Sequence, residues 1–140
     1  MIPRRGSVRR QVRVARPAAE VWALVGDPAR LAEWFPGVTS VTVEGDHRRV
    51  ATAAGVTFDE DLLTVDPLAR RFQYRVTGGL FHEHLGTLDV LDLGDGTCLV
   101  VYATDADPAT LALVVGGAAG AGIERARCIL EGARPVGWGA

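Results

Sequence analysis

The order of the expected elements constrains the fold of this chain more than any other feature. After position 37 the sequence alternates between short apolar-polar segments and turn residues, and it ends in one long helical segment. Short connections predict consecutive antiparallel hairpins. The chain has only one long helix to cover these strands, so we expect the sheet to curl around that helix.

The segments are placed by their hydrophobic period and by the turn and capping residues between them. The expected strands cover 8–14, 38–44, 48–53, 56–65, 71–77, 82–93 and 97–106. Two short helices follow the first strand, one at 18–25 and one that Asp27 caps and that ends at Pro36-Gly37. We expect Asp107 to cap the long helix, with Pro108 in the first turn and the end near Gly132.

This order predicts an α+β fold of the helix-grip kind. A seven-stranded curved antiparallel sheet wraps around a long C-terminal helix, and two short helices follow the first strand. Neither an internal repeat nor a linker divides the sequence, so we expect one domain over 1–140. We expect residues 134–140 to form a disordered tail.

Composition and charge exclude several classes of protein. A formal net charge of −2 argues against a nucleic-acid partner. The longest uncharged stretch, 108–123, is shorter than the roughly 20 residues that span a bilayer, so we expect no membrane insertion. Cys98 and Cys128 lie far apart and predict free thiols, and no apolar signal follows the basic N-terminus. We therefore predict a cytoplasmic protein, either a monomer or a homodimer.

Two motifs connect the chain to a known family. One is a turn, Gly94-Asp95-Gly96-Thr97, before the last strand; the other opens the chain with Pro17-Ala18-Ala19-Glu20-Val21-Trp22 and then Asp27-Pro28, Leu31 and Glu33-Trp34-Phe35-Pro36-Gly37-Val38. The sequence resembles the START/Bet v 1-like (SRPBCC) superfamily, in its bacterial polyketide cyclase/dehydrase and lipid-transport branch. The resemblance implies a cavity between sheet and helix, but it leaves the ligand open because members act on very different apolar molecules.

A run of small residues lies in the middle of the expected long helix. Residues 116–122 read Gly-Gly-Ala-Ala-Gly-Ala-Gly. Each glycine inside a helix costs about 0.8–1 kcal/mol relative to alanine, so something must offset the cost. Close packing against another element is one explanation, and ligand space beneath the helix is the other, which we favour. A membrane dimer motif, Gly116-x-x-x-Gly120, fails because the helix is too short to span a bilayer.

Four polar residues are candidate catalytic residues because alternation directs them toward the expected interior: Glu60, Tyr74, His82 and His84. The two histidines are two apart on a strand and therefore share a face, and Glu60 shares a face with Phe58. Such a cluster could orient a ligand oxygen or move a proton in an aldol-type cyclisation. The alternative is that the histidines mark a strand end near solvent and that Glu60 pairs with an arginine.

The candidate ligand-binding residues are the aromatic and aliphatic side chains expected near the cavity and the small residues of the helix: Trp34, Phe35, Phe58, Leu62, Phe72, Phe81, Tyr102, Leu113, Gly117, Gly120 and Ala121. For Trp34 a purely structural place in the core is the alternative. The two histidines supply half of a zinc site, and no phosphate-binding loop or Ser-His-Asp arrangement is present. We therefore expect no metal and no cofactor.

These observations favour binding or transport of a small apolar ligand, lipid-like or aromatic and polyketide-like, in an internal cavity. No complete catalytic constellation is visible, so we favour binding without catalysis. A polyketide aromatase/cyclase that uses a few polar groups of the cavity is the alternative. A protein-interaction or stress-response module without a ligand is the third hypothesis, and a filled core would favour it.

Overall fold

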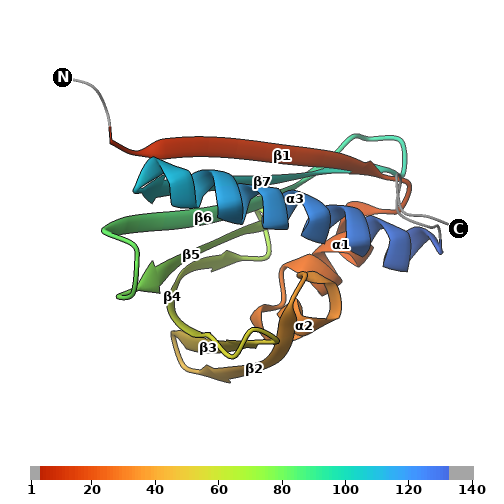
Figure 1. The fold of residues 1–140 in the computed structure, drawn as a ribbon. Helices are drawn as coiled ribbons and strands as arrows, with labels where there is room; N and C mark the ends of the chain where they lie inside the picture. The colour runs from red at the N-terminus through yellow and green to blue at the C-terminus, as the bar shows by residue number, and fades with distance from the viewer. Residues whose placement is uncertain (1–3, 133–140) are drawn as a thin grey trace, which may run out of the picture.

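The computed structural model describes residues 4–132 (Figure 1). Strand β1 (Gly6–Val14) is followed by helix α1 (Ala18–Val25), a 3₁₀ turn η1 (Pro28–Arg30) and helix α2 (Leu31–Trp34). Then come β2 (Val38–Glu44), β3 (His47–Thr52), β4 (Thr57–Asp66), β5 (Arg71–Thr77), β6 (Glu83–Asp92), β7 (Cys98–Asp107) and helix α3 (Ala109–Glu131). The tail expected at 134–140 lies outside the described residues.

The seven strands form one antiparallel sheet in the order β1-β7-β6-β5-β4-β3-β2. Every strand pairs with its neighbour in sequence except at β1, which pairs with β7. Figure 1 shows that the sheet curves and that α3 lies along β1 and β7. Helices α1 and α2 lie between one end of α3 and the β2–β3 part of the sheet. The predicted helix-grip fold is therefore confirmed.

Two predicted assignments near the junction of β7 and α3 are wrong. Asp107 does not cap α3: it stays in the β7 ladder opposite Glu83, and Pro108 occupies the cap position without a side-chain cap bond. The backbone N–H of His82 donates to the Asp107 carbonyl at 2.8 Å. Strand β6 begins only at Glu83, so His82 falls outside it. The expected second short helix divides into η1 and α2, and Asp27 caps it as predicted, accepting from the Ala29 N–H at 2.9 Å.

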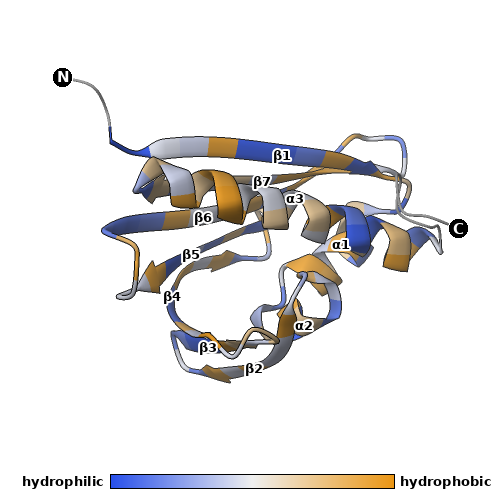
Figure 2. Cartoon of the chain, viewed as in Figure 1, coloured by the Kyte–Doolittle hydropathy of each residue, from blue (hydrophilic) through white to orange (hydrophobic). Residues whose placement is uncertain are grey.

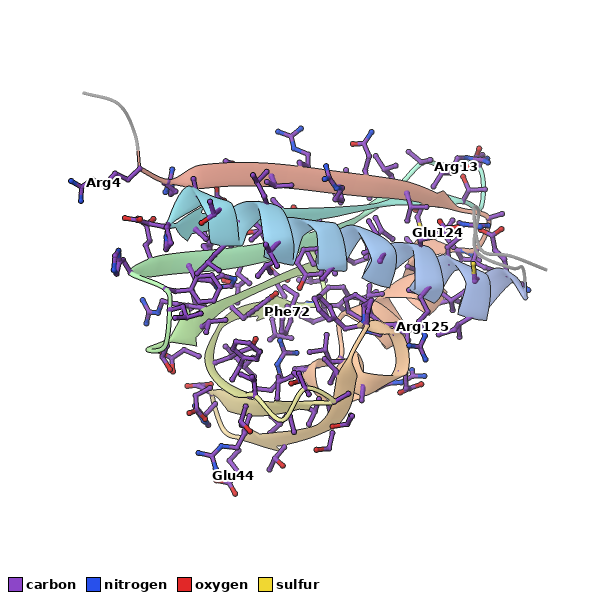
Figure 3. All side chains as sticks on the ribbon, viewed as in Figure 1. Arg4, Arg13, Glu44, Phe72, Glu124 and Arg125 are labelled. Atoms are coloured by element: carbon purple, nitrogen blue, oxygen red, sulfur yellow. The ribbon has the colours of Figure 1, made fainter. Side chains whose placement is uncertain are left out.

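The core lies between the inner face of the sheet and α3. The buried positions of α3 include Ala112, Gly116, Ala119, Ile123 and Ala126, which recur every three or four residues and so form one stripe. Figure 2 shows that the middle of α3 is mostly hydrophobic whereas β1 is mostly hydrophilic. In Figure 3, Phe72 lies in the interior, while Arg4, Arg13 and Glu44 extend outward.

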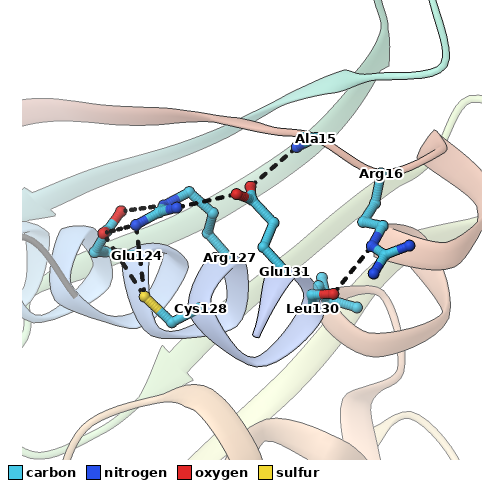
Figure 4. A network of polar contacts seen from close by, with 7 residues as sticks. All are labelled: Ala15, Arg16, Glu124, Arg127, Cys128, Leu130 and Glu131. Carbon is cyan, nitrogen blue, oxygen red and sulfur yellow. Dashed lines mark hydrogen bonds and ion pairs between the residues drawn. The ribbon is translucent and has the colours of Figure 1, made fainter. Parts of the chain in front are cut away.

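A polar network fastens the C-terminal end of α3 to the connection between β1 and α1 (Figure 4). Arg127 bridges Glu124 at 2.6 Å and Glu131 at 3.1 Å. Glu131 also accepts from the backbone N–H of Ala15 at 3.0 Å, and Arg16 donates to a carbonyl of the last helical turn at 3.1 Å. These contacts hold the helix at one end against the rim of the sheet.

Candidate ligand-binding cavity

A cavity of about 220 Å³ lies between the middle of α3, the end of α2 and the inner faces of β2 to β6. Its wall is mostly apolar. Six residues that the sequence singled out line it: Phe35, Phe58, Glu60, Tyr74, Phe81 and His84. Sequence reasoning did not single out the aliphatic part of the wall, which includes Leu31, Val38, Val50, Val76, Val114 and Val115. Alternation was the available signal for the strand residues, because Val50 and Val76 occupy inward positions of their strands.

The remaining candidates lie elsewhere. Trp34, Phe72 and Tyr102 are buried in the core, and Leu62 is half-buried outside the cavity wall. Leu113, Gly117 and Ala121 lie on the exposed side of α3. The side chain of His82 is 78% exposed and lies 3.7 Å from the Asp107 carboxylate. His82 therefore does not share a site with His84, because β6 begins one residue too late to orient both inward.

Three glycines of α3, Gly116, Gly120 and Gly122, serve close packing. A Cβ atom at Gly116 would lie 2.6 Å from a methyl of Val8, and one at Gly120 would lie 3.0 Å from Arg10 Cγ, both on β1. A Cβ at Gly122 would lie 3.2 Å from the ring of Trp34. The interpretation as ligand space therefore does not hold for these three glycines. Ala118 is the member of the run that lines the cavity within the described chain.

A buried ion pair adjoins the cavity, and Glu60 is the partner that lines it. Arg48 and Glu60 face each other across β3 and β4, and their side chains are 2% and 8% exposed. Arg48 Nε donates to Glu60 Oε1 at 2.6 Å, and Nη1 donates to the Pro28 carbonyl at 3.1 Å. Burial raises the pKa of the Glu60 carboxyl, and the guanidinium of Arg48 opposes this rise. The alternative that Glu60 pairs with an arginine is confirmed, but the pair lies inside the molecule.

Arg48 itself was missed by sequence reasoning. Arg48 and Arg49 are adjacent, and their charge does not reveal which of them faces inward. The guanidinium carbon of Arg48 lies 5.1 Å from the ring centre of Tyr74 and 5.2 Å from that of Phe72, within cation–π range. The pairing register of β3 with β4 is what places Arg48 opposite Glu60. This register is a property of the folded sheet, so the sequence does not give it.

Tyr74 lies between the ion pair and His84. Its hydroxyl is hydrogen-bonded to the hydroxyl of Tyr102, and burial raises the pKa of both phenols, so both stay protonated. The ring centre of Tyr74 lies 5.4 Å from that of His84. Gly86 makes room for the ring, because a Cβ there would lie 2.4 Å from Tyr74 Cε1.

His84 is held where the pairing of β5 with β6 stops. The ladder between these strands ends at Tyr74 opposite Gly86, and beyond it the backbone N–H of Val76 donates to His84 Nδ1 at 3.0 Å. Because Nδ1 accepts, the neutral ring carries its proton on Nε2. Burial lowers the pKa of His84 to about 4, against the opposing charge of Asp105, so the ring is neutral at neutral pH. Nε2 is buried and has no hydrogen-bond partner among the described residues.

The remaining cysteines and possible metal ligands lie apart from this cavity in the described part of the chain. Cys98 and Cys128 are both buried and free. Within residues 4–132, no group of three or more His, Cys, Asp and Glu side chains is placed to hold a metal ion. No helix in this part of the chain has the length and apolar character that crossing a bilayer requires.

Solved structures share this fold at low sequence identity. XoxI from Bacillus cereus is 20% identical with a TM-score of 0.82, over 89% of this chain and 94% of that one. A protein from Thermobifida fusca is 30% identical with a TM-score of 0.72, over 86% and 90%. Norcoclaurine synthase from Thalictrum flavum, solved with dopamine and hydroxybenzaldehyde, is 16% identical with a TM-score of 0.72, over 93% and 88%.

The family comparison covers nearly the whole described chain. No curated protein matches the sequence. The family described as polyketide cyclase / dehydrase and lipid transport matches residues 5–132, which include every element and the complete cavity wall. The chain therefore belongs to the polyketide cyclase/dehydrase and lipid transport family.

Proposed function

We propose that this chain binds a small, mostly apolar molecule of one or two rings in the cavity beneath α3. The observation that supports this most is a space of about 220 Å³ whose wall is aliphatic and aromatic apart from a few polar side chains. Small-molecule sites combine an apolar wall with a few placed polar groups in this way. Family membership points in the same direction.

The volume favours a compact ligand. An apolar cavity of about 150 Å³ in another protein holds benzene. The space here is larger, at about 220 Å³, but it lies below the roughly 300–1,000 Å³ of pockets that bury drug-sized molecules. One ring or two fused rings therefore suit it better than a long acyl chain.

Filling the cavity tests this proposal. Ala118 lies in the cavity wall, so Ala118→Phe places a ring in the space that the ligand needs. Ala121 lies three residues further along α3 on its exposed side, so Ala121→Phe adds the same bulk outside the cavity. Calorimetric titration with 1-naphthol, a two-ring probe, should show binding to the wild type and to Ala121→Phe, and at least about tenfold weaker binding to Ala118→Phe.

The titration has two outcomes that contradict the proposal. In one, wild-type protein takes up no 1-naphthol. In the other, Ala118→Phe binds the probe as tightly as Ala121→Phe does, which would place the binding site elsewhere. Native mass spectrometry of the purified wild type would then identify any natural guest by its mass.

Cyclisation is a second candidate function, and the Arg48–Glu60 pair favours it. Glu60 is a carboxyl in the cavity wall with a raised pKa, which suits a general base better than an ordinary carboxylate. It would take a proton from the carbon next to a ligand carbonyl. The resulting enolate would attack a second carbonyl of the same molecule, and the protonated Glu60 would return its proton to the alkoxide that forms. Glu60 would then take the second proton from the same carbon as the hydroxyl leaves as hydroxide, and the hydroxide would take that proton from Glu60 to form water. The cavity would supply shape and one base.

A simple diketone tests the cyclase hypothesis. 2,6-Heptanedione closes to 3-methylcyclohex-2-enone with loss of one water, and the product absorbs in the ultraviolet. If Glu60 is the base, Glu60→Gln should lower the rate by about 100-fold or more. Asp61→Asn, a neighbouring carboxylate on the other face of β4, is the matched control.

Glu60→Gln leaves Arg48 buried without its partner, which costs about 3–5 kcal/mol of stability. The pH–rate profile of the wild type gives a reading that does not depend on the variant, since the rate should fall as Glu60 becomes protonated at acid pH. A rate equal to that of the reaction without protein would remove the cyclase hypothesis and leave binding in place.

A further inference from the structure

We infer that the ligand of this cavity carries a carbonyl oxygen and that the Nε2–H of His84 donates a hydrogen bond to it. The inference rests on the proposed binding function and adds the chemical class of the ligand, a ketone or aldehyde on one or two rings. Neither the family description nor the similar structures assign a role to His84 in this chain.

The position of His84 is fixed by two kinds of contact. The Val76 N–H occupies Nδ1, which leaves the proton on Nε2. The imidazole packs against the rings of Phe81 at 5.0 Å and of Tyr74 at 5.4 Å, and all three side chains line the cavity. His84 is therefore a rigid donor placed in the wall before any ligand arrives.

The donor on Nε2 needs an acceptor. The residue is 2% exposed, and no atom of the described chain accepts from Nε2. A buried donor without a partner costs free energy, and native proteins satisfy nearly all such groups. His84 is one of the residues that line the cavity, so a ligand seated against its ring is the group that would supply the missing acceptor.

A carbonyl fits this place better than a hydroxyl or a carboxylate. A hydroxyl brings a proton of its own, and the aromatic rings of Tyr74 and Phe81 beside His84 offer it no strong acceptor. A carboxylate would bring an unpaired charge into an apolar space that already contains Glu60. A carbonyl accepts without donating and carries no net charge.

Matched ligands test the inference directly. Tetralin, 1-tetralone and 1-tetralol share one two-ring frame and differ at one carbon. Calorimetric titration of the wild type should give 1-tetralone about tenfold tighter binding than tetralin, the gain of one net hydrogen bond. 1-Tetralol should bind more weakly than 1-tetralone.

Variants at two histidines assign the effect to one residue. His84→Leu should lose the preference for the ketone while binding tetralin as before, and His84→Gln, which keeps a neutral N–H donor, should retain most of it. His82→Leu is the matched control, since His82 lies two residues away with an exposed side chain. If His84→Leu does not fold, the ¹⁵N signal of His84 Nε2 in the wild type still decides: it should shift on adding 1-tetralone and stay unchanged with tetralin.

The results that would contradict the carbonyl inference differ from those that would contradict the proposed binding function. Equal binding of tetralin and 1-tetralone, or of 1-tetralol and 1-tetralone, overturns the carbonyl inference and leaves the proposed binding function intact. Absence of binding by all three probes and by 1-naphthol overturns both.

Discussion

At the scale of single residues, the cavity depends on groups whose partners lie on other strands. Glu60 is paired by Arg48 from β3, and His84 is held by the Val76 N–H from β5. Each is buried at some electrostatic cost, and each has a compensating contact. His84 is the clearer case for measurement, because burial shifts its pKa far enough to affect stability in an accessible pH range.

His84 should make the protein less stable as the pH falls from about 6.5 to about 4. The folded ring has a pKa of about 4 and the unfolded one an ordinary pKa near 6.5, so in this window the unfolded chain binds the extra proton. The shift corresponds to about 3 kcal/mol of lost unfolding free energy at the acid end. Urea unfolding at pH 7 and pH 4.5 should show about 2 kcal/mol of this loss in the wild type and a smaller loss in His84→Gln.

Two other groups affect the stability of the protein in the same pH range. Asp105 raises the pKa of His84 and so reduces the loss. The raised pKa of Glu60 works the other way, because its contribution to stability is lost as the pH rises. Both remain in His84→Gln, so the difference between the two proteins isolates the histidine. An identical pH dependence in wild type and variant would show that His84 is not buried as a neutral ring.

At the scale of elements, α3 is positioned by its smallest residues. Gly116 and Gly120 bring the helix backbone against Val8 and Arg10 of β1, and the network around Arg127 fixes the C-terminal end. With this side of the helix pressed on β1, Val114, Val115 and Ala118 border the cavity. The cavity therefore lies beside the contact of Gly116 and Gly120 with β1. The close approach of α3 to β1 determines where the helix borders the cavity.

Substitution of two adjacent glycines by alanine should change the stability of the protein in opposite directions. Gly116→Ala places a Cβ 2.6 Å from the Val8 methyl, and the overpacking should outweigh the gain in helix propensity, for a net loss of about 1 kcal/mol. Gly117→Ala meets nothing within 4 Å, so it should stabilise the protein by about 0.5–1 kcal/mol. Thermal unfolding of the two variants checks both signs. Stabilisation by Gly116→Ala would mean that α3 does not press on β1.

At the scale of the whole molecule, a single helix and a curved sheet enclose a space that neither could form alone. The two ends of the sheet differ. Strands β1 and β7 pack closely against α3, whereas β2 to β5 curve away and leave the space that α2 partly closes (Figure 1). Binding and cyclisation both use this space, and the titrations with 1-naphthol and 2,6-heptanedione separate them.

Local signals in the sequence were enough to predict the elements, their order and most of their inward faces. Turn residues and apolar alternation are local signals, and they placed Tyr74 and Glu60 inside without knowledge of the fold. The motif around Trp34, near the start of the sequence, indicated the family. The predictions failed at the ends of elements, as at His82, because the length of a strand depends on what pairs with it.

Which side chains contact one another depends on the packing of the strands and α3. A strand's period fixes the face of a residue but not its partner across the sheet, so Arg48 could not be assigned to Glu60 beforehand. Nor could the rotation of α3 about its axis be read from 108–123, where no charge marks an outer side. Packing against β1 fixed that rotation, and it directed Ala118 toward the cavity and Gly117 toward solvent.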